Sequence, residues 1–330
     1  MARRFINEFT DNDSVNEVFR ASNKMLRTNR NGDPYLQVNL SDKTGTLTAR
    51  MWNANETIYG SFDNGDYVRV DGKTQIFQGA MQMIIKKIYR FPASDVNPDD
   101  FAAVSNLQID KLVVKLTEKI RHMQNPALQA LGECYLLDSD FMKAFTTLPA
   151  GVKLHHAYPG GLLEHVFSIM EIAERVGGYY EKLDTELLVF GAFLHDTGKT
   201  LELEGDSDFA YTDAGQLLGH MQLGISLLEQ KIAEAEKLMG EPFPLELALR
   251  LKHMILSHHG EYQFGSAKLP MTPEAMVLHC LDLLDSKLAT FEQFIADDLN
   301  ADSSWTTYHT NLERKLFKGL PKGKQGEAGK

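Results

Sequence analysis

The chain has 330 residues, of which 43% are hydrophobic and 24% are charged, and its formal net charge is −11. These values are typical of a soluble globular protein with one large or two smaller domains. No stretch approaches the roughly 20 apolar residues that span a bilayer, and the first residues carry no apolar run of signal-peptide length. Cys134 and Cys280 lie far apart, outside any CxxC spacing. The sequence therefore argues against a membrane protein, a disulfide framework and a zinc ribbon, and we expect a cytoplasmic protein.

The net charge hides an asymmetry along the chain. Residues 20–92 contain 11 Lys or Arg against 6 Asp or Glu, whereas residues 93–330 contain 21 against 35. A basic N-terminal module on an acidic body suits an enzyme that collects a polyanion. A solvated surface explains the basic excess equally well.

The N-terminal part has the pattern of a small β-barrel. Short, largely alternating segments are separated by turn signals such as Asn31–Asp33 and Asn64–Asp66. These expected strands are Tyr35–Leu40, Thr46–Trp52, Tyr67–Val70 and Met81–Ile85. About five strands without a long helix between them fit a closed barrel, and residues 12–92 resemble a nucleic-acid-binding OB-fold.

Cations and aromatic residues are interleaved in this barrel segment. We expect Arg27, Arg50 and Lys73 to follow a nucleic-acid backbone, while Trp52 and Phe77 stack on bases. The alternative is that the aromatic residues fill the barrel and the cations merely solvate it. The predicted partner of this module is a single-stranded nucleic acid.

The remaining chain has helical periodicity. Residues 93–151 read as a polar linker followed by bridging helices over Leu107–Met123 and Pro126–Leu148. A main all-α helical domain is expected over residues 152–312. Residues 313–330 are expected to be a disordered basic tail. The predicted protein is thus multidomain, with an all-β barrel followed by an all-α bundle, and its oligomeric state stays open.

Histidines and aspartates recur on successive predicted helices of the second domain. The segment Glu186–Leu194 is apolar almost throughout and ends in His195 and Asp196. An ionised aspartate at the end of a buried helix is costly unless a positive charge compensates it, and a divalent metal ion would do so. The other candidate ligands are His165, His220, His258, His259 and Asp282.

The order H…HD…H…HH…D resembles the HD superfamily of metal-dependent phosphohydrolases. The mononuclear pattern needs His165, the His195–Asp196 pair and Asp282, and the three additional histidines resemble the binuclear subset. Imidazole and carboxylate donors suit Mn²⁺, Fe²⁺, Co²⁺ or similar first-row ions better than Mg²⁺ alone, and Mn²⁺ is the ion that we expect first. Any one of these histidines taken alone would more often be a hydrogen-bonded core residue than a ligand.

Two longer strings, His155–His165 and His258–Ala275, narrow the resemblance. Together with the barrel in front of them, they are similar to the YhaM-type 3′→5′ exoribonucleases, over roughly residues 12–312. This resemblance implies an OB-fold followed by an HD domain and a manganese-type metal dependence. It also implies removal of nucleotides from the 3′ end of single-stranded RNA, with some action on DNA. The GYP triplet of cyclic-dinucleotide phosphodiesterases is missing after the paired histidines, where the sequence reads GEYQFG.

The chemistry expected of such a centre assigns further roles. Two metal ions about 3.5–4 Å apart can activate a water and hold the attacking and leaving oxygens of a phosphodiester. Asp196 is expected to bridge the ions, and Lys199 to neutralise a phosphate oxygen or, alternatively, to interact with a helix dipole. His156 and Tyr158 would contact the terminal nucleotide or simply shape the entry turn.

Two other functions remain open from the sequence. One is an HD-type nucleotide phosphohydrolase in which the barrel serves assembly or regulation. The other is a nucleic-acid-binding factor whose metal site is structural.

Overall fold

The computed structural model describes residues 3–29, 32–77, 80–101, 106–151, 158–205, 209–296, 298, 303–310 and 312–319. They form two compact units. One contains the described residues up to 101 together with those from 289 onward, and the other contains the described residues between 106 and 288. Across the part of the chain that is described, no helix is both long and apolar enough to span a bilayer.

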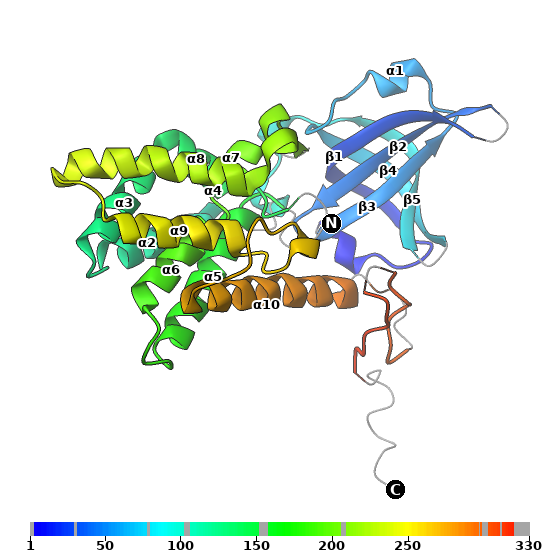
Figure 1. Cartoon of the computed structure of the whole chain (residues 1–330). Helices are drawn as coiled ribbons and strands as arrows, with labels where there is room; N and C mark the ends of the chain where they lie inside the picture. Colours follow the sequence, from blue (N-terminus) through cyan, green and yellow to red (C-terminus); the bar gives the residue numbers. More distant parts are fainter. Residues whose placement is uncertain are drawn as a thin grey trace, which may run out of the picture. The chain divides into compact units, whose positions relative to one another are not determined.

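The first unit is built on a closed five-stranded barrel with the strand order β1-β2-β3-β5-β4, in which β3 and β5 are parallel (Figure 1). The strands are β1 (Ser14–Thr28), β2 (Pro34–Asp42), β3 (Gly45–Trp52), β4 (Tyr67–Phe77) and β5 (Ala80–Arg90), with the short helix α1 (Glu56–Tyr59) between β3 and β4. Alternation places Leu36, Val38 and Leu40 of β2 in the buried core. The barrel predicted from the sequence is confirmed.

Short elements and the C-terminal residues complete this unit. Three 3₁₀ turns are η1 (Ile6–Glu8), η2 (Ala93–Asp95) and η3 (Pro98–Asp100). Residues 313–319 were expected to belong to a disordered tail. Arg314 and Phe317 instead form isolated bridges with His309 and Trp305, and residues 320–330 lie outside the described part.

The second unit is helical, as predicted. Its elements are α2 (Asn106–Arg121), α3 (Pro126–Leu136), α4 (Ser139–Thr147), α5 (Gly161–Gly177), α6 (Thr185–Leu194), α7 (Lys199–Glu202), β6 (Leu203–Glu204), β7 (Ala210–Tyr211), α8 (Asp213–Met239), α9 (Leu245–Ser257), η4 (Tyr262–Phe264) and α10 (Pro273–Ala296), which runs past residue 288. Helix α6 is buried from Leu187 to Leu194. It therefore forms the centre of the core, as its apolar sequence indicates.

The helices before residue 151 belong to the same core. Residues of α2 and α3 such as Leu116, Ile120 and Leu131 are fully buried against the later helices. The run Pro126–Leu148 is two helices, because the first ends at Leu136 and the side chain of Asp138 caps the second by accepting from the backbone N–H of Asp140 and Phe141. The helical unit therefore includes α2, α3 and α4, whereas the sequence analysis expected the helical domain to begin at residue 152.

Candidate metal centre

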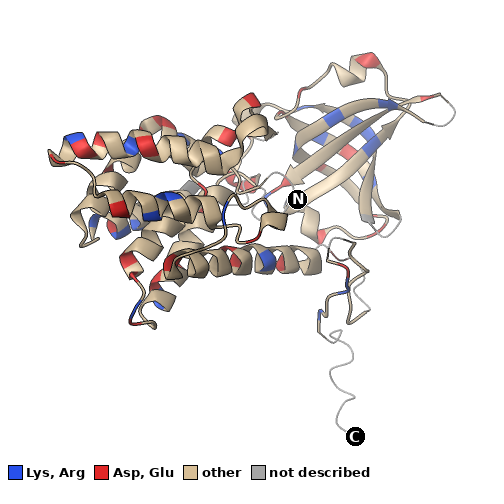
Figure 2. Ribbon diagram, viewed as in Figure 1, with Lys and Arg blue, Asp and Glu red and all other residues tan. Residues whose placement is uncertain are grey.

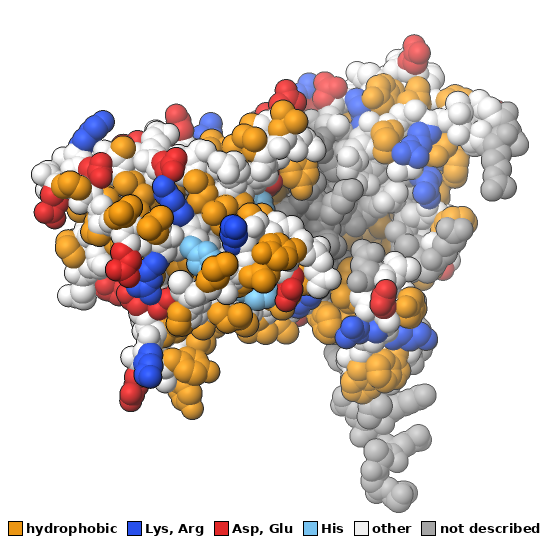
Figure 3. Space-filling view, in the orientation of Figure 1, with side chains coloured by type: hydrophobic (Ala, Val, Ile, Leu, Met, Phe, Trp, Pro, Cys, Tyr) orange, Lys and Arg blue, Asp and Glu red, His pale blue; other side chains and the backbone are white. Residues whose placement is uncertain are grey.

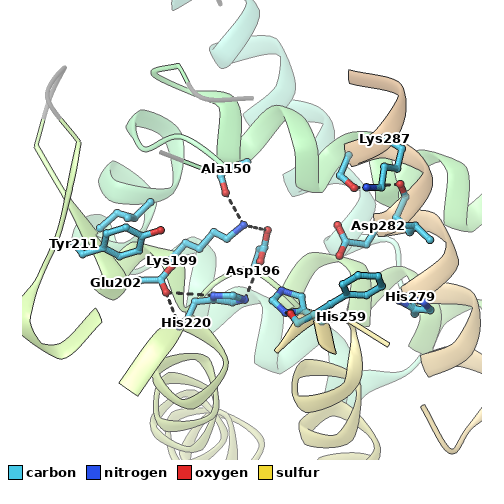
Figure 4. Close-up of a pocket in the computed structure, with 15 residues that line it drawn as sticks. Ala150, Asp196, Lys199, Glu202, Tyr211, His220, His259, His279, Asp282 and Lys287 are labelled. Atoms are coloured by element: carbon cyan, nitrogen blue, oxygen red, sulfur yellow. Dashed lines mark hydrogen bonds and ion pairs between the residues drawn. The ribbon is translucent and has the colours of Figure 1, made fainter. Parts of the chain in front are cut away.

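Five elements of the helical unit carry the predicted metal ligands. His165 lies on α5, His195 and Asp196 follow the end of α6, and His220 lies on α8. His258 and His259 follow the end of α9, and Asp282 lies on α10. In Figure 3 pale-blue histidine side chains reach the surface of the helical unit, and Figure 4 shows several of these residues from inside the pocket.

Two glycines shape the backbone around the centre, one by a close approach and one by a break in a helix. A Cβ atom on Gly198 would lie 1.9 Å from the backbone oxygen of His220, so only glycine lets the His195–Lys199 turn pack on α8. Helix α8 is broken at Gly219, where φ is 72° and ψ is 160°, a conformation open essentially to glycine. At this break the backbone N–H of His220 donates to Glu202 Oε1 at 2.9 Å.

Six of the predicted ligands form two groups of three. His165, His195 and Asp282 make one group, and His220, His258 and His259 make the other. Within each group the donor atoms lie within 4.8 Å of one another. In the first group His165 Nε2 lies 3.3 Å from Asp282 Oδ1.

Asp196 stands between the two groups with one carboxylate oxygen toward each. Its Oδ2 lies 3.5 Å from His165 Nε2 and 3.4 Å from His195 Nε2. Its Oδ1 lies 3.7 Å from His220 Nε2 and 3.8 Å from His258 Nε2. Two ligands bound to one cation at about 2.1 Å stand about 3–3.5 Å apart, so these separations are close to those of ligands sharing an ion.

The hydrogen bonds of the histidines leave lone pairs facing one another. The Nδ1 atom of His258 lies 2.7 Å from the carbonyl oxygen of Ile255, which can only accept, so His258 Nε2 carries no proton when the ring is neutral. His220 Nδ1 faces the Glu202 carboxylate at 3.4 Å, and its Nε2 lies 3.4 Å from His258 Nε2. A proton or a metal cation between the two nitrogens relieves the repulsion of their lone pairs, so the pair is suited to share a cation.

The first group contains the same kind of unsatisfied acceptor. His195 Nδ1 lies 2.7 Å from the carbonyl oxygen of Ala192, which leaves Nε2 as the acceptor. Among the described residues, no hydrogen-bond partner reaches His195 Nε2 or Asp196 Oδ1, although both atoms are buried. Buried acceptors without donors are costly. The residues present therefore fit divalent cations.

The environment keeps both central carboxylates ionised. Burial alone would raise the pKa of Asp196, but the charge of Lys199 and contacts with His195 hold it well below its usual range. For Asp282 burial also acts upward, while His165 and His195 bring the pKa below its usual range. Both side chains therefore offer negatively charged oxygens at neutral pH.

Three of the histidines have pKa values that are shifted, in opposite directions. Burial lowers the pKa of His258 far below its usual value, and the neighbouring His259 and His195 add to this effect. Burial, with His220, also lowers the pKa of His259. For His165 burial acts in the same direction but is outweighed by Asp282 and Asp285, so its pKa rises to about 9.

Lys199 contacts the centre directly. Its Nζ donates to Asp196 Oδ2 at 2.6 Å and to the carbonyl oxygen of Ala150 at 2.5 Å. Burial would lower the pKa of Lys199, but Asp196 raises it, so the side chain stays charged. The sequence analysis expected the Lys199 charge to neutralise a phosphate oxygen. In the structure this charge is already paired with the Asp196 carboxylate.

The two residues predicted to contact the terminal nucleotide are placed differently. Tyr158 donates a hydrogen bond to Glu164 Oε2 at 2.6 Å, and it is not one of the described residues that line the pocket at the centre. His156 lies outside the described residues.

A cavity of about 460 Å³ opens onto the centre and contains residues that the sequence analysis missed. Asp196, Lys199, His220, His259 and Asp282 line it, and its other walls include Tyr211, Phe264, Ser286 and Lys287 (Figure 4). Phe264 is 55% exposed and Tyr211 45% exposed. Phe264 lies in the string His258–Ala275, but no spacing signal in the sequence distinguishes either aromatic residue from a surface residue.

Two carboxylates with little exposed surface were also missed. Glu202 follows Lys199 by three residues and lies against His220. Asp285 Oδ2 lies 2.8 Å from Nδ1 of His165, a residue far away in the sequence. The feature that distinguishes Glu202 from its polar neighbours is its burial, and burial is not visible in the sequence. The sequence therefore gives no signal for its role.

The residues selected in the barrel share its outer surface. Arg27 pairs with Tyr35, which pairs with Trp52, and directly paired residues of neighbouring strands point to the same face. Arg50 and Lys73 share a face of the sheet in the same way, because Ile84 of β5 pairs with Arg50 on one side and with Lys73 on the other.

The aromatic residues do not fill the barrel. Trp52 is 47% exposed and Phe77, at the end of β4, is 51% exposed. The Tyr35 and Trp52 rings lie 5.2 Å apart, and Figure 2 shows Lys and Arg positions along the barrel strands. The alternative of an aromatic barrel filling is therefore wrong for these two residues.

Comparisons with known proteins agree with this architecture. Residues 18–90 match the family model of an OB-fold nucleic acid binding domain, and residues 162–287 match the HD domain. The 3'-5' exoribonuclease YhaM of Geobacillus sp. (strain WCH70) is 36% identical over 78% of this chain and 78% of its own length. The YhaM proteins of Bacillus velezensis and Bacillus subtilis are 32% and 34% identical, covering 85% and 82% of this chain and 87% and 83% of their own length. The chain belongs to the family of YhaM 3′-5′ exoribonucleases, with an OB-fold nucleic-acid-binding domain followed by an HD domain.

Proposed function

We propose that the helical unit binds two divalent cations and that the enzyme uses them to release nucleotides one at a time from the 3′ end of single-stranded RNA. The observation that carries this proposal is Asp196, whose two oxygens face the two groups of ligands. One cation would be held by His165, His195 and Asp282, and the other by His220, His258 and His259. The name of the relatives supports the RNA substrate and the 3′-to-5′ direction.

The donor set supports a first-row ion. Five imidazoles and two carboxylates suit Mn²⁺ better than Mg²⁺ alone, and we therefore propose Mn²⁺. When bound, such a pair of cations lowers the pKa of a water molecule and stabilises the charge that develops on the phosphate oxygens. Asp196 faces both groups of ligands and would contribute one oxygen to each cation.

Lys199 is proposed to contact the scissile phosphate. Its ammonium has three N–H groups, of which two are used by Asp196 and Ala150. The third can donate to a phosphate oxygen where Lys199 lines the cavity, and a fixed positive charge there stabilises charge that develops during hydrolysis.

The wall of the cavity offers binding groups for the terminal nucleotide. Its volume of about 460 Å³ falls within the roughly 300–1,000 Å³ of small-ligand sites. The exposed rings of Tyr211 and Phe264 provide surfaces on which a base can stack, and Lys287 adds a positive charge. Stacking accepts any base, as an enzyme that degrades a whole strand requires.

The barrel is proposed to hold the rest of the strand. Arg27, Arg50 and Lys73 would follow the phosphates, and Trp52 and Phe77 would stack on bases, which matches the way OB-folds use this face and the adjoining loops. Neither stacking nor phosphate contact reads the 2′-hydroxyl, so we expect single-stranded DNA to be a substrate as well. Both cysteines are free thiols, and we propose a reducing cytoplasm as the compartment.

The test is digestion of a 5′-labelled single-stranded RNA with Mn²⁺, with EDTA, and with the Asp196→Asn protein. We expect a Mn²⁺-dependent ladder that keeps the label and shortens from the 3′ end. Asp196→Asn should lower the rate by about 10³-fold or more, because one electrostatic group aimed at developing charge is worth about 10²–10³ and Asp196 serves both groups. The matched control is Asp110→Asn, which removes the charge of an exposed aspartate on α2 and should leave the rate unchanged.

Each alternative has its own signature in this assay. Immediate release of labelled mononucleotide would reverse the proposed direction. Intact RNA together with hydrolysis of free nucleotides would favour a nucleotide phosphohydrolase. RNA binding without hydrolysis, unaffected by Asp196→Asn, would favour a binding factor with a structural metal site.

A further inference from the structure

The five candidate histidine ligands differ in what lies behind them. His195, His258 and His259 have their Nδ1 atoms at 2.7, 2.7 and 3.0 Å from the backbone carbonyl oxygens of Ala192, Ile255 and Phe264. These acceptors are neutral and lie within five residues of each histidine. A carbonyl is therefore sufficient to fix the ring tautomer and to direct Nε2 toward the centre.

His165 is backed by a carboxylate instead. Its Nδ1 lies 2.8 Å from Asp285 Oδ2, and the Ser168 hydroxyl donates to the other oxygen, Oδ1, at 2.7 Å. Asp285 lies 120 residues away in the sequence, so this contact exists only because α10 packs against α5. The side chain of Asp285 is only 11% exposed.

His220 has the same kind of partner. Its Nδ1 lies 3.4 Å from Glu202 Oε1, and its backbone N–H donates to the same oxygen at 2.9 Å. Glu202 is buried, and Figure 4 shows it beside His220 at the edge of the pocket. Each group of three ligands thus contains one histidine with a buried carboxylate behind it.

These two carboxylates are costly to bury. Neutral carbonyls are enough to fix the tautomer of the three neighbouring histidines. Fixing the tautomer therefore does not explain why a negatively charged side chain lies behind the other two. A buried anion is retained at low cost where a positive charge lies nearby. A carboxylate behind a ligating imidazole makes the ring a stronger donor and adds negative charge to the site.

We propose that Asp285 and Glu202 are positioning residues that set the cation affinity of the two sites separately, Asp285 through His165 and Glu202 through His220. This inference rests on the proposed pair of cations. It assigns one carboxylate to each site, so the two sites can be weakened one at a time.

The experiment measures Mn²⁺ binding by isothermal titration calorimetry on the full chain after removal of metal, without RNA. The wild type should bind two equivalents. Asp285→Asn and Glu202→Gln should each weaken one equivalent by about 10–100-fold and leave the other unchanged, and the double variant should weaken both. The amide oxygen still accepts from the histidine, so a role limited to holding the ring would leave both affinities intact.

Two further variants make the result specific. Ser168→Ala removes the hydroxyl that supports Asp285 and should weaken the same equivalent as Asp285→Asn, to a smaller extent. Glu204→Gln removes an exposed charge two residues from Glu202 and should change neither affinity.

The outcomes separate the two proposals. Two equivalents in the wild type with unchanged affinities in both variants would overturn the role of these carboxylates and leave the two-cation centre standing. Equal weakening of both equivalents by either single variant would overturn the assignment of one carboxylate to each site. A single equivalent in the wild type would overturn the pair of cations and this inference with it.

Discussion

Replacing Gly198 with alanine should disable the centre without altering any chemical group in it. The backbone of Gly198 has ordinary helical angles, φ −63° and ψ −18°, so alanine brings no conformational strain. The added Cβ would lie 1.9 Å from His220 O and 2.5 Å from Gly224 N, both of them backbone atoms. An unstrained C···O contact is about 3.3 Å or longer, so the turn and α8 must separate by more than about 1 Å.

This displacement has two measurable consequences. Overpacking of this kind costs about 3 kcal/mol, at the upper end of the usual range, which lowers the unfolding temperature of a unit of this size by roughly 6–12 °C. Asp196 and Lys199 lie on the same turn and would move relative to His220. A misplacement of about 1 Å lowers turnover by about 10²-fold.

The control lies on the other side of the same contact. A Cβ on Gly224 would meet Gly198 N and Ile255 Cγ2 at 3.5 Å, an ordinary contact. Gly224→Ala should therefore keep full activity and gain up to about 1 kcal/mol of helix stability. Calorimetry and RNA digestion on both variants test the reasoning. It would be refuted by a Gly198→Ala enzyme as stable and active as Gly224→Ala.

Three further predictions concern other parts of the molecule. Phe264→Ala should raise KM for RNA about 10-fold, because one base–ring stack is worth about 1–3 kcal/mol, with little change in hydrolysis of bis(p-nitrophenyl) phosphate. The control is Tyr262→Ala, which lies in the same 3₁₀ turn but is not among the described residues lining the cavity. Equal effects of the two substitutions would contradict the stacking role. Trp52→Ala should weaken RNA binding, measured by fluorescence anisotropy, by about 5–100-fold. The control Trp305→Ala, which changes a tryptophan of similar exposure, should not weaken it. Unchanged binding with Trp52→Ala would show that the barrel face is not part of the binding surface. Lys231 is 3% exposed and its Nζ lies 2.8 Å from both Asp138 Oδ2 and Glu234 Oε2, so Lys231→Met should cost about 2 kcal/mol of unfolding free energy at neutral pH. Burial acts to raise the pKa of Asp138, but Lys231 holds it below its usual range. The contribution of this ion pair to the free energy of unfolding is therefore complete above about pH 5 and is lost as pH falls through the lowered pKa of Asp138. A stability difference between wild type and variant that grew on acidification would show this sign to be wrong.

The sequence predicted the parts of this protein whose signals are local. Alternation in Leu36, Val38 and Leu40 identifies a barrel strand, because a strand with one buried face must repeat every two residues. The apolar run Leu187–Leu194 identifies a buried helix, and the His–Asp pair at its end stands out because of that burial. The contacts of His195 and His258 with carbonyl oxygens three residues earlier are also local, because both histidines stand at helix ends, but they were not predicted.

The arrangement of the centre was decided by tertiary packing. Sequence order could name seven ligands, but it could not divide them into two groups or place one oxygen of Asp196 toward each, since this depends on how five elements cross. The partner of Asp285 is 120 residues distant, and the role of Glu202 depends on a break in α8 at Gly219. The candidate metal-binding residues are thus readable from the chain, because the chemistry restricts the residue types. Their distances, and the carboxylates behind them, come only from the fold, because contacts between remote segments leave no period or spacing in a single sequence.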